Sequence, residues 1–378
     1  MHNEDANKIA AKFDIDAEVL QKDIYDLKVD LGKKGFNLNS DLVLDVTESI
    51  DDLSKVWTPT TPIIHIIQNC NSPCIMCDCW KTRHKVSHSL NALKPLFTDL
   101  ADRGVHSLMI SGGEPLMHPE CRQIVQFVKS LGVRVELNTN GILLHKNMWV
   151  IEEDIDEIVV SMDATNRENY KLIRGADKFD LVWKNIQRIK ETKPSQSIGA
   201  RVTLTKDFLR DLQGSISHLL EKGVNFVGFS PLDQFSTSFS RSDNSVTNGT
   251  KLGEKLLPVE AELKAIRGEL NEPTSKISCA VKTFYDRQEI SWNVRNFVDC
   301  IDLYLGENNP KLRSADLCKF PFISLVLDYD GELKCCFYSK SFGNIYNYDQ
   351  IDWTAKNTVA DLHNSGKCRS CRGKVFCG

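Results

Sequence analysis

Three cysteines stand close together in the run Asn69-Cys-Asn-Ser-Pro-Cys-Ile-Met-Cys77. Cys70, Cys74 and Cys77 have the spacing C-x3-C-x2-C and follow an apolar segment, Ile63–Ile67, that predicts a buried strand. Thiolates are soft ligands that select iron–sulfur clusters, zinc or copper(I). Three cysteines are one short of a closed cage, so a cluster held here keeps one iron open to another ligand. The spacing alone also fits a zinc knuckle, but the open position indicates a catalytic site.

A glycine-rich turn gives a second signal. Ile110-Ser-Gly-Gly-Glu-Pro115 follows an apolar run and precedes a helix-like stretch, and its glycines let the backbone approach a neighbour closely. Taken alone, this turn is equally consistent with a strand–helix connection that binds nothing. Together with the cysteine spacing, it resembles the radical S-adenosylmethionine (SAM) superfamily.

The resemblance implies a specific chemistry. In that family the open iron of a [4Fe–4S] cluster binds the amino and carboxylate groups of SAM, and an electron from the cluster cleaves SAM to a 5′-deoxyadenosyl radical. A reductant such as flavodoxin or ferredoxin supplies the electron. The implied cluster ligands are Cys70, Cys74 and Cys77, and the implied contacts to the SAM amino group are Gly112, Gly113 and Glu114.

Between Thr61 and Leu232, short apolar runs alternate with helical periods, which is typical of parallel βα units. The predicted strands are Ile63–Ile67, His106–Ile110, Val133–Asn138, Ile155–Ser161, Ile198–Leu204 and Asn225–Phe229. The predicted helices are Leu90–Arg103, Pro119–Leu131, Leu143–Ile151, Phe179–Thr192 and Asp207–Lys222. We therefore expect an α/β fold, a partial (β/α)6 barrel, which is also the fold of the resembling family.

Polar residues follow several of these strands. Active sites of βα barrels lie at the carboxyl ends of the strands, so the cysteine loop, the Gly-Gly-Glu-Pro turn, Asn138 and Ser161 can face one cavity. By resemblance, Asn138 lies near the cofactor and Ser161 binds the ribose or carboxylate of SAM. Arg174 matches an arginine that meets the SAM carboxylate, a task that suits a bidentate guanidinium, although a surface position is equally expected. Asp163 either binds substrate or caps the next helix, and we favour the cap.

A second group of cysteines lies near the end of the chain. Asp328-Tyr-Asp-Gly331 between the apolar runs Ile323–Leu327 and Glu332–Cys336 predicts a β-hairpin. Cys318 and Cys336, spaced C-x17-C, together with Cys368-x2-Cys371 supply four thiolates, enough for a closed cage. By spacing alone this cage also suits zinc.

The same region resembles the SPASM and twitch extensions of radical SAM enzymes. The spacings Cys318-x12-Gly331-x4-Cys336 and Cys368-x2-Cys371-x5-Cys377 match the opening and the middle of the SPASM pattern. The resemblance implies one auxiliary [4Fe–4S] cluster on Cys318, Cys336, Cys368 and Cys371, with an electron-transfer or structural role. Two later SPASM cysteines are missing. Strand alternation places Cys335 and Cys336 on opposite faces, so they compete for one ligand position, and Cys377 is a spare ligand or a free thiol.

Four regions follow from these patterns: a helical segment 1–56, the barrel 57–232, a linker and helical region 233–315, and the auxiliary-cluster region 316–378. Residues 235–252 of the third region are rich in Ser, Thr and Asn, and residues 258–270 look helical. The segment 1–56 resembles the last two helices of the precursor-peptide recognition element, which binds a peptide leader by strand addition. The receiving strands are missing, and a helical cap on the barrel is equally expected.

Composition bounds the class of protein. The chain has 378 residues, 41% of them hydrophobic, and a net charge of −4, which gives no basic footprint for nucleic acid. No apolar run approaches the roughly 20 residues that span a bilayer, and the N-terminus lacks a basic and apolar signal segment. Thirteen cysteines favour clusters over disulfides in a reducing compartment, so we expect a cytoplasmic enzyme.

The expected activity is that of a radical SAM oxidoreductase or maturase that abstracts a hydrogen atom from its substrate. The first hypothesis is that it crosslinks, epimerises or oxidises a ribosomally made peptide. The alternative is a dehydrogenase or epimerase of a small molecule such as a sugar or an aminoglycoside. A metal-stabilised binding protein without activity is disfavoured by the Gly-Gly-Glu-Pro turn and by the missing fourth cysteine.

Overall fold

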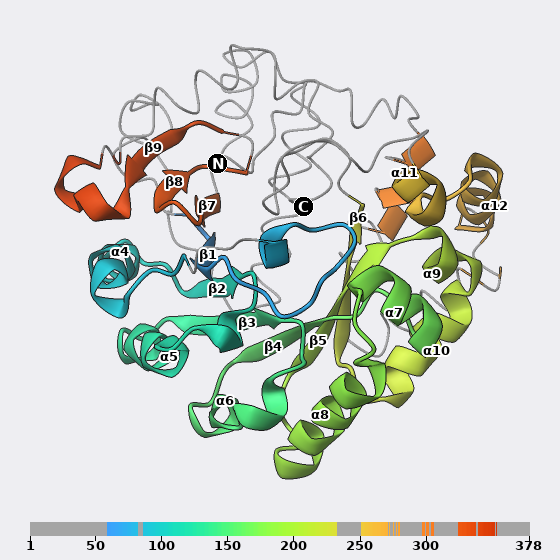
Figure 1. The fold of residues 1–378 in the computed structure, drawn as a ribbon, viewed down its shortest axis with the longest axis horizontal. Helices are drawn as coiled ribbons and strands as arrows, with labels where there is room; N and C mark the ends of the chain where they lie inside the picture. The colour runs from blue at the N-terminus through green and yellow to red at the C-terminus, as the bar shows by residue number, and fades with distance from the viewer. Residues whose placement is uncertain are drawn as a thin grey trace, which may run out of the picture.

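The computed structural model describes residues 59–81, 86–232, 251–270, 324–337 and 339–351, with scattered residues between 272 and 305 and residue 353 (Figure 1). The predictions for residues 1–56 and 235–250 lie outside the described residues, as do Cys318, Cys368, Cys371 and Cys377.

One sheet organises the described residues. Its nine strands have the order β6-β5-β4-β3-β2-β1-β7-β8-β9. The strands are β1 (Thr61–Ile67), β2 (Ser107–Gly112), β3 (Arg134–Thr139), β4 (Glu157–Ser161), β5 (Ile198–Leu204), β6 (Phe226–Pro231), β7 (Ser324–Leu327), β8 (Glu332–Lys334) and β9 (Ser341–Asn344). Strands β1 to β6 pair in parallel with their neighbours, and the sheet curves without closing (Figure 1).

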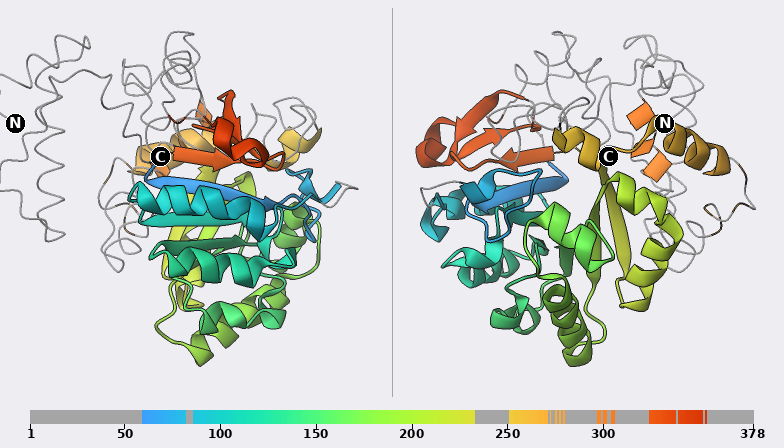
Figure 2. Two further views of the ribbon diagram at one scale, coloured as in Figure 1. Left: turned by 90° about the vertical axis from the view of Figure 1, so that its left-hand side faces the viewer. Right: turned by 45° about the vertical axis from the view of Figure 1, so that its right-hand side comes forward.

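Helices cover the outer face of the curved sheet, as Figures 1 and 2 show. The α-helices are α4 (Leu90–Asp102), α5 (Cys121–Ser130), α6 (Trp149–Glu152), α7 (Arg167–Arg174), α8 (Phe179–Thr192), α9 (Lys206–Arg210), α10 (Leu212–Glu221), α11 (Lys251–Leu256) and α12 (Glu260–Leu270). Short 3-10 turns are η2 (Cys79–Lys81), η3 (Pro115–Met117), η4 (Leu144–Lys146) and η5 (Ile345–Gln350). In α4 the buried residues Leu93, Leu96, Phe97 and Leu100 recur at helical spacing, so one stripe packs on the sheet.

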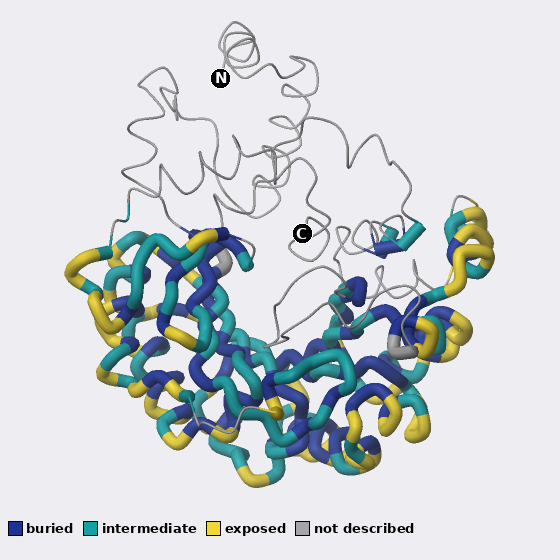
Figure 3. The backbone as a smooth tube through the Cα atoms, turned by 45° about the horizontal axis from the view of Figure 1, so that its top comes forward, coloured by how far each residue is buried: buried dark blue, intermediate teal, exposed yellow. Residues whose placement is uncertain are grey.

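The core lies between this outer layer and the sheet. In β3, Val135 and Leu137 are fully buried against the helices, while the alternate residues Glu136 and Asn138 face the inside of the curve and stay partly exposed. Figure 3 shows the same division, with buried residues towards the sheet and exposed residues on the outer turns. Alternation therefore leaves polar side chains free to line an interior cavity.

The expected fold class is confirmed, and the strand predictions agree with the observed strands within a few residues. Two predicted helices are wrong in detail. The stretch Leu143–Ile151 is divided into η4 and α6, and Asp207–Lys222 is divided into α9 and α10 at Asp211, whose backbone leaves the helical region (φ −123°, ψ 49°). Helix α7 was not predicted at all.

The predicted C-terminal hairpin is confirmed in β7 and β8, but its position is a new finding. Strand β7 pairs in parallel with β1, with Thr61 opposite Ser324 and Ile64 opposite Leu327. The hairpin and β9 therefore extend the barrel sheet beyond β1, at the edge opposite β6, although β6 is the strand that precedes β7 in the sequence. Among the described helices, none is long and apolar enough to cross a membrane.

Candidate functional site

A cavity of about 210 Å³ lies at the carboxyl ends of the parallel strands. Its lining includes most of the predicted site, namely Cys70, Cys74, Cys77, Gly112, Gly113, Asn138, Ser161 and Arg174. Glu114 is the predicted barrel residue missing from that lining. Residues spread over more than 100 positions of the chain are thus brought to one place because parallel strands end at the same edge.

The two glycines of the Gly-Gly-Glu-Pro turn hold the cysteine loop. The backbone N–H of Gly113 donates to the Ile67 carbonyl at 2.7 Å, and that of Glu114 donates to the Asn69 carbonyl at 2.8 Å. A Cβ on Gly113 would lie 2.1 Å from the Gln68 carbonyl oxygen. The missing side chains therefore allow β2 to approach the start of the cysteine loop.

The Glu114 side chain fixes the same turn from inside. Its carboxylate is fully buried and accepts from the Thr139 hydroxyl at 2.7 Å and from the backbone N–H groups of Asn140 at 2.8 Å and Leu116 at 3.1 Å. Burial raises the pKa of Glu114, and these hydrogen bonds oppose the rise. The carboxylate thus links the turn to the end of β3. A contact of Glu114 with SAM stays a prediction.

The C-terminal end of α7 supports the other side of the cysteine loop. The Ile75 N–H donates to the Ile173 carbonyl at 3.0 Å, and the Ser72 hydroxyl donates to the Arg174 carbonyl at 3.1 Å. Gly175 adopts φ +69°, and a Cβ there would lie 2.0 Å from the Pro73 carbonyl oxygen. The helix that the sequence did not reveal is therefore one of the two supports of the cysteines.

Polar donors surround two of the three sulfurs. Cys70 Sγ accepts from the Ser72 N–H at 3.5 Å and from Asn140 Nδ2 at 3.7 Å. Cys74 Sγ accepts from Arg174 Nη1 at 3.6 Å and lies 3.3 Å from the Ser72 hydroxyl. Burial raises the pKa of Cys70 to about 12, so a bound metal has to displace its proton. Donors at a ligand sulfur stabilise its negative charge and tune a cluster.

Arg174 is buried and not at the surface. Its Nη2 lies 2.7 Å from Asp163 Oδ2, and the two side chains are 10% and 1% exposed. Asp163 Oδ1 also accepts from the Thr203 N–H at 2.7 Å. The predicted helix cap at Asp163 is therefore wrong, because Asn166 caps α7 by accepting from the Asn169 N–H at 2.9 Å.

The structure adds residues that the sequence did not single out. His65, Arg201, Tyr329 and Phe337 line the same cavity. The ring of Tyr329 stacks on His65 with centroids 4.9 Å apart, and its hydroxyl lies 3.4 Å from Cys79 Sγ. Strand alternation could have located His65 and Arg201 in the cavity, because they are polar residues at inward positions of β1 and β5. Tyr329 has no such signal, since its place depends on the pairing of β7 with β1.

The residues present fit a cluster with SAM. Within the described residues, no three His, Cys, Asp or Glu side chains form a site for one metal ion. A [4Fe–4S] cluster does not need such convergence, because each thiolate binds a different iron. The soft donor set faces a cavity into which Asn138 also points, and Asn138 Oδ1 is buried without a hydrogen-bond partner in the described part of the chain. An unpaired buried acceptor of this kind is what a polar cofactor would satisfy.

The second cysteine group is described only in part. Cys335 and Cys336 are both buried, and burial raises the pKa of Cys335 to about 12. The Ser339 hydroxyl accepts from the Cys336 N–H at 3.2 Å. The other proposed ligands lie outside the described residues, so the auxiliary cluster stays a prediction.

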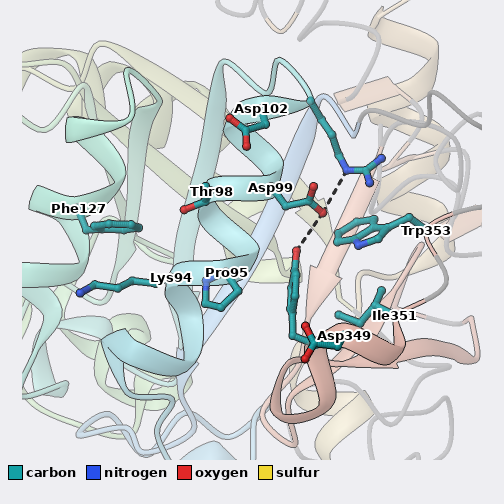
Figure 4. Close-up of a pocket in the computed structure, with 11 residues that line it drawn as sticks. Lys94, Pro95, Thr98, Asp99, Asp102, Phe127, Asp349, Ile351 and Trp353 are labelled. Carbon is teal, nitrogen blue, oxygen red and sulfur yellow. Dashed lines mark hydrogen bonds and ion pairs between the residues drawn. The ribbon is translucent and has the colours of Figure 1, made fainter.

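A second hollow of about 610 Å³ lies on the outer side, between α4 and the segment after β9 (Figure 4). Tyr348 donates to Asp99 at 3.0 Å, Arg103 Nε lies 3.2 Å from the same carboxylate, and the Arg103 guanidinium stands 4.5 Å from the centre of the Trp353 ring. None of the predicted site residues lines this hollow. Its contacts join α4 to the C-terminal extension, so it does not compete with the interior cavity as the functional site.

The family comparison agrees with the geometry. Residues 64–215 match the family profile described as "Radical SAM superfamily". This range contains the cysteine loop, the Gly-Gly-Glu-Pro turn, Asn138, Ser161 and Arg174. This part of the chain is therefore a radical SAM domain, and the superfamily implies a [4Fe–4S] cluster and SAM.

Relatives in sequence act on different substrates. The "Probable GTP 3',8-cyclase" of Sulfurisphaera tokodaii is 26% identical over 299 residues, which cover 77% of this chain and 82% of that protein. The "GTP 3',8-cyclase" of Chlorobaculum tepidum is 28% identical over 176 residues, 46% of this chain and 53% of that protein. The "Fe-coproporphyrin III synthase" of Methanosarcina barkeri is 26% identical over 178 residues, 46% and 42% of the two chains. The last two matches span only about half of those relatives.

Solved structures share the fold. SuiB of Streptococcus suis, bound to S-adenosylmethionine, has a TM-score of 0.61 at 13% identity, covering 93% of this chain and 80% of that one. The protein anSMEcpe with bound AdoMet has a TM-score of 0.53 at 16% identity, covering 84% and 88%. At such identities the likeness establishes the architecture and leaves the substrate open.

Proposed function

We propose that this chain is a radical SAM enzyme that abstracts a hydrogen atom from a substrate bound in the interior cavity. The observation that carries the proposal is the shared lining of that cavity, where Cys70, Cys74 and Cys77 meet Gly112, Gly113, Asn138 and Ser161. When bound on the three cysteines, the cluster supplies the electron that cleaves SAM.

The protein's own residues have separate tasks in this proposal. Asn138 and Ser161 orient SAM from the ends of β3 and β4, since both line the cavity beside the cysteines. Arg174 places a positive charge at the Cys74 sulfur, and Asp163 holds the guanidinium in place.

A ribosomally made peptide is the first proposed substrate, to be crosslinked, epimerised or oxidised. Likeness in fold supports this choice. SuiB has been solved bound to the precursor peptide SuiA, and anSMEcpe with the Kp18Cys peptide, at TM-scores of 0.58 and 0.55. The auxiliary cluster on Cys318, Cys336, Cys368 and Cys371 belongs to the same proposal.

A small molecule is the second proposed substrate. Likeness in sequence supports it, because a relative aligned over 77% of this chain and 82% of its own length is described as a "Probable GTP 3',8-cyclase". The sequence alone favoured a sugar or an aminoglycoside as the small molecule, and a nucleotide now joins this class.

The test is SAM cleavage by anaerobically reconstituted, dithionite-reduced protein, with 5′-deoxyadenosine measured by liquid chromatography. Wild type is expected to form 5′-deoxyadenosine, and the triple variant Cys70→Ala/Cys74→Ala/Cys77→Ala is expected to form none. The exposed Cys279 gives the matched control, Cys279→Ser, which is expected to retain cleavage. Cleavage by the triple variant at the wild-type rate would remove the proposal.

A further inference from the structure

The cavity is lined by a second arginine, Arg201, to which the predicted SAM site assigns no task. Arg201 lies on β5, where its Cα pairs with Ser161 of β4 on one side and with Gly228 of β6 on the other. Its side chain lines the cavity and is partly exposed. Arg201 therefore stands next to the predicted SAM site but one strand further along the curve.

No contact in the described part of the chain neutralises this guanidinium. Among the described residues, no ion pair or side-chain hydrogen bond involves Arg201, in contrast to Arg174, which pairs with Asp163 at 2.7 Å. Glu136 is close enough for Arg201 to lower its pKa, but burial has the larger effect and raises that pKa overall. A partly buried arginine without a contacting carboxylate can accept an anionic ligand at little rearrangement.

The described residues also leave space beside Arg201. Among them, no atom lies within 4 Å of a Cβ built on Gly228, whereas a Cβ on Gly199 would lie 2.0 Å from the Phe226 ring. Within the described part of the chain, the space next to Gly199 is thus occupied by Phe226, and the space next to Gly228 is open. His65, which lines the same cavity, has a buried Nδ1 without a hydrogen-bond partner in the described residues.

We propose that Arg201 binds an oxyanion of the substrate, a phosphate or a carboxylate, in the open space over Gly228. The inference rests on the proposed function, because it assigns a substrate group to the same cavity. A guanidinium holds a phosphate or carboxylate through two parallel N–H···O bonds. A nucleotide would bring the phosphate, and an acidic residue of a peptide would bring the carboxylate.

The test is binding, measured by anaerobic calorimetry on reconstituted enzyme with SAM present. The probes are GTP for the phosphate source and acetyl-Ala-Glu-Ala-amide for the carboxylate source. Arg201→Gln is expected to weaken binding of the recognised probe by about tenfold or more, the usual worth of a charged hydrogen-bonded pair. Arg201→Lys is expected to lose less. The matched control is Arg188→Gln, an exposed arginine of α8, with wild-type affinity expected.

A second pair of variants tests the open space over Gly228 while it leaves the charge of Arg201 in place. Gly228→Leu fills the open space and is expected to lower probe affinity at least as much as Arg201→Gln, whereas Gly228→Ala fits without contact and is expected to change it little. The proposal is overturned if wild type binds neither probe, or if Arg201→Gln leaves the affinity for both unchanged. Weaker binding of SAM with unchanged probe binding would also overturn it. Failure of the proposed function would show separately, as no 5′-deoxyadenosine from wild type.

Discussion

The two cysteine groups differ in the contacts that the described residues make around them. At the cysteine loop, Cys70 and Cys74 receive donors from Ser72, Asn140 and Arg174, and two β-strand ends and α7 fix the backbone. At the hairpin, Cys335 and Cys336 follow β8 as buried neighbours, and the described contacts of Ser339 go to the Cys336 backbone. The first group thus has donors that stabilise negative sulfurs. The proposed partners of Cys336, namely Cys318, Cys368 and Cys371, lie outside the described residues.

Iron content separates the two groups most sharply. If both hold [4Fe–4S] clusters, anaerobic reconstitution should give about eight irons per wild-type chain and about four in either cysteine-deleted variant. The variants are Cys70→Ala/Cys74→Ala/Cys77→Ala and Cys318→Ala/Cys336→Ala/Cys368→Ala/Cys371→Ala. About four irons per wild-type chain would mean that one cluster forms, and would contradict the auxiliary cluster. Metal analysis and protein quantification on the same samples give the ratio.

The second prediction tests the close approach of β2 to the cysteine loop. Gly113→Ala places a Cβ only 2.1 Å from the Gln68 carbonyl oxygen and 2.3 Å from the Asn69 carbonyl oxygen, which is closer than real Cβ contacts. Overpacking of this kind costs about 2–3 kcal/mol of unfolding free energy. SAM affinity should fall by about tenfold or more, because a shifted cysteine loop holds the cluster out of line with the rest of the SAM site. Urea unfolding and SAM titration measure the two effects.

The matched control is Gly268→Ala in α12, where a Cβ meets nothing within 4 Å. Alanine is the better helix former, so this variant should be neutral or slightly more stable. Equal stability and SAM affinity for Gly113→Ala and Gly268→Ala would show that the turn does not support the cysteine loop.

The buried pair behind Cys74 gives a smaller effect. Asp163→Asn leaves the buried Arg174 without its carboxylate, which should lower the unfolding free energy by about 3 kcal/mol. Asp177→Asn breaks the exposed pair with Arg167, where the side chains are 37% and 60% exposed, and should cost below about 1 kcal/mol. Denaturant unfolding compares the two. A loss at Asp163 as small as that at Asp177 would contradict the ion-pair role.

The smallest effect concerns Glu157, the first residue of β4. Burial, and then the neighbouring Glu136, raise the pKa of Glu157 to about 7. Because the folded state then binds a proton that the unfolded state releases at about pH 4.3, stability falls as pH rises from about 4 to 7. Glu157→Gln should therefore stabilise the protein by about 1 kcal/mol at pH 8, discounted for partial exposure, and by almost nothing at pH 4.

Thermal unfolding at both pH values, with the exposed Glu221→Gln as the control, measures this difference. A Glu157→Gln gain that is the same at pH 4 and pH 8 would mean that the carboxylate titrates at its ordinary value.

Much of the cysteine loop's setting could be predicted from the sequence. Periodicity located the strands to within a few residues, and strand ends located Asn138 and Ser161 at the cavity because parallel strands share one polar edge. The three cysteines predicted a site for a metal or a cluster, and their resemblance to the radical SAM superfamily, together with the Gly-Gly-Glu-Pro turn, predicted its chemistry. These features are local, so a short stretch of sequence carries each of them.

The misses are contacts between distant parts of the chain. The sequence favours Asp163 as a helix cap, but its partner is Arg174, at the far end of a helix that the sequence did not reveal. Tyr329 enters the cavity only because β7 pairs with β1 across more than 250 positions. No local pattern specifies such a pairing, since it depends on which sheet edge is left open.

The central claim is that the cluster on Cys70, Cys74 and Cys77 keeps one iron for SAM. Electron paramagnetic resonance of the reduced, reconstituted Cys318→Ala/Cys336→Ala/Cys368→Ala/Cys371→Ala variant isolates that cluster. Adding SAM should change its g-values, because the superfamily implies that the amino and carboxylate groups of SAM would bind the open iron. A spectrum that SAM leaves unchanged would contradict the account.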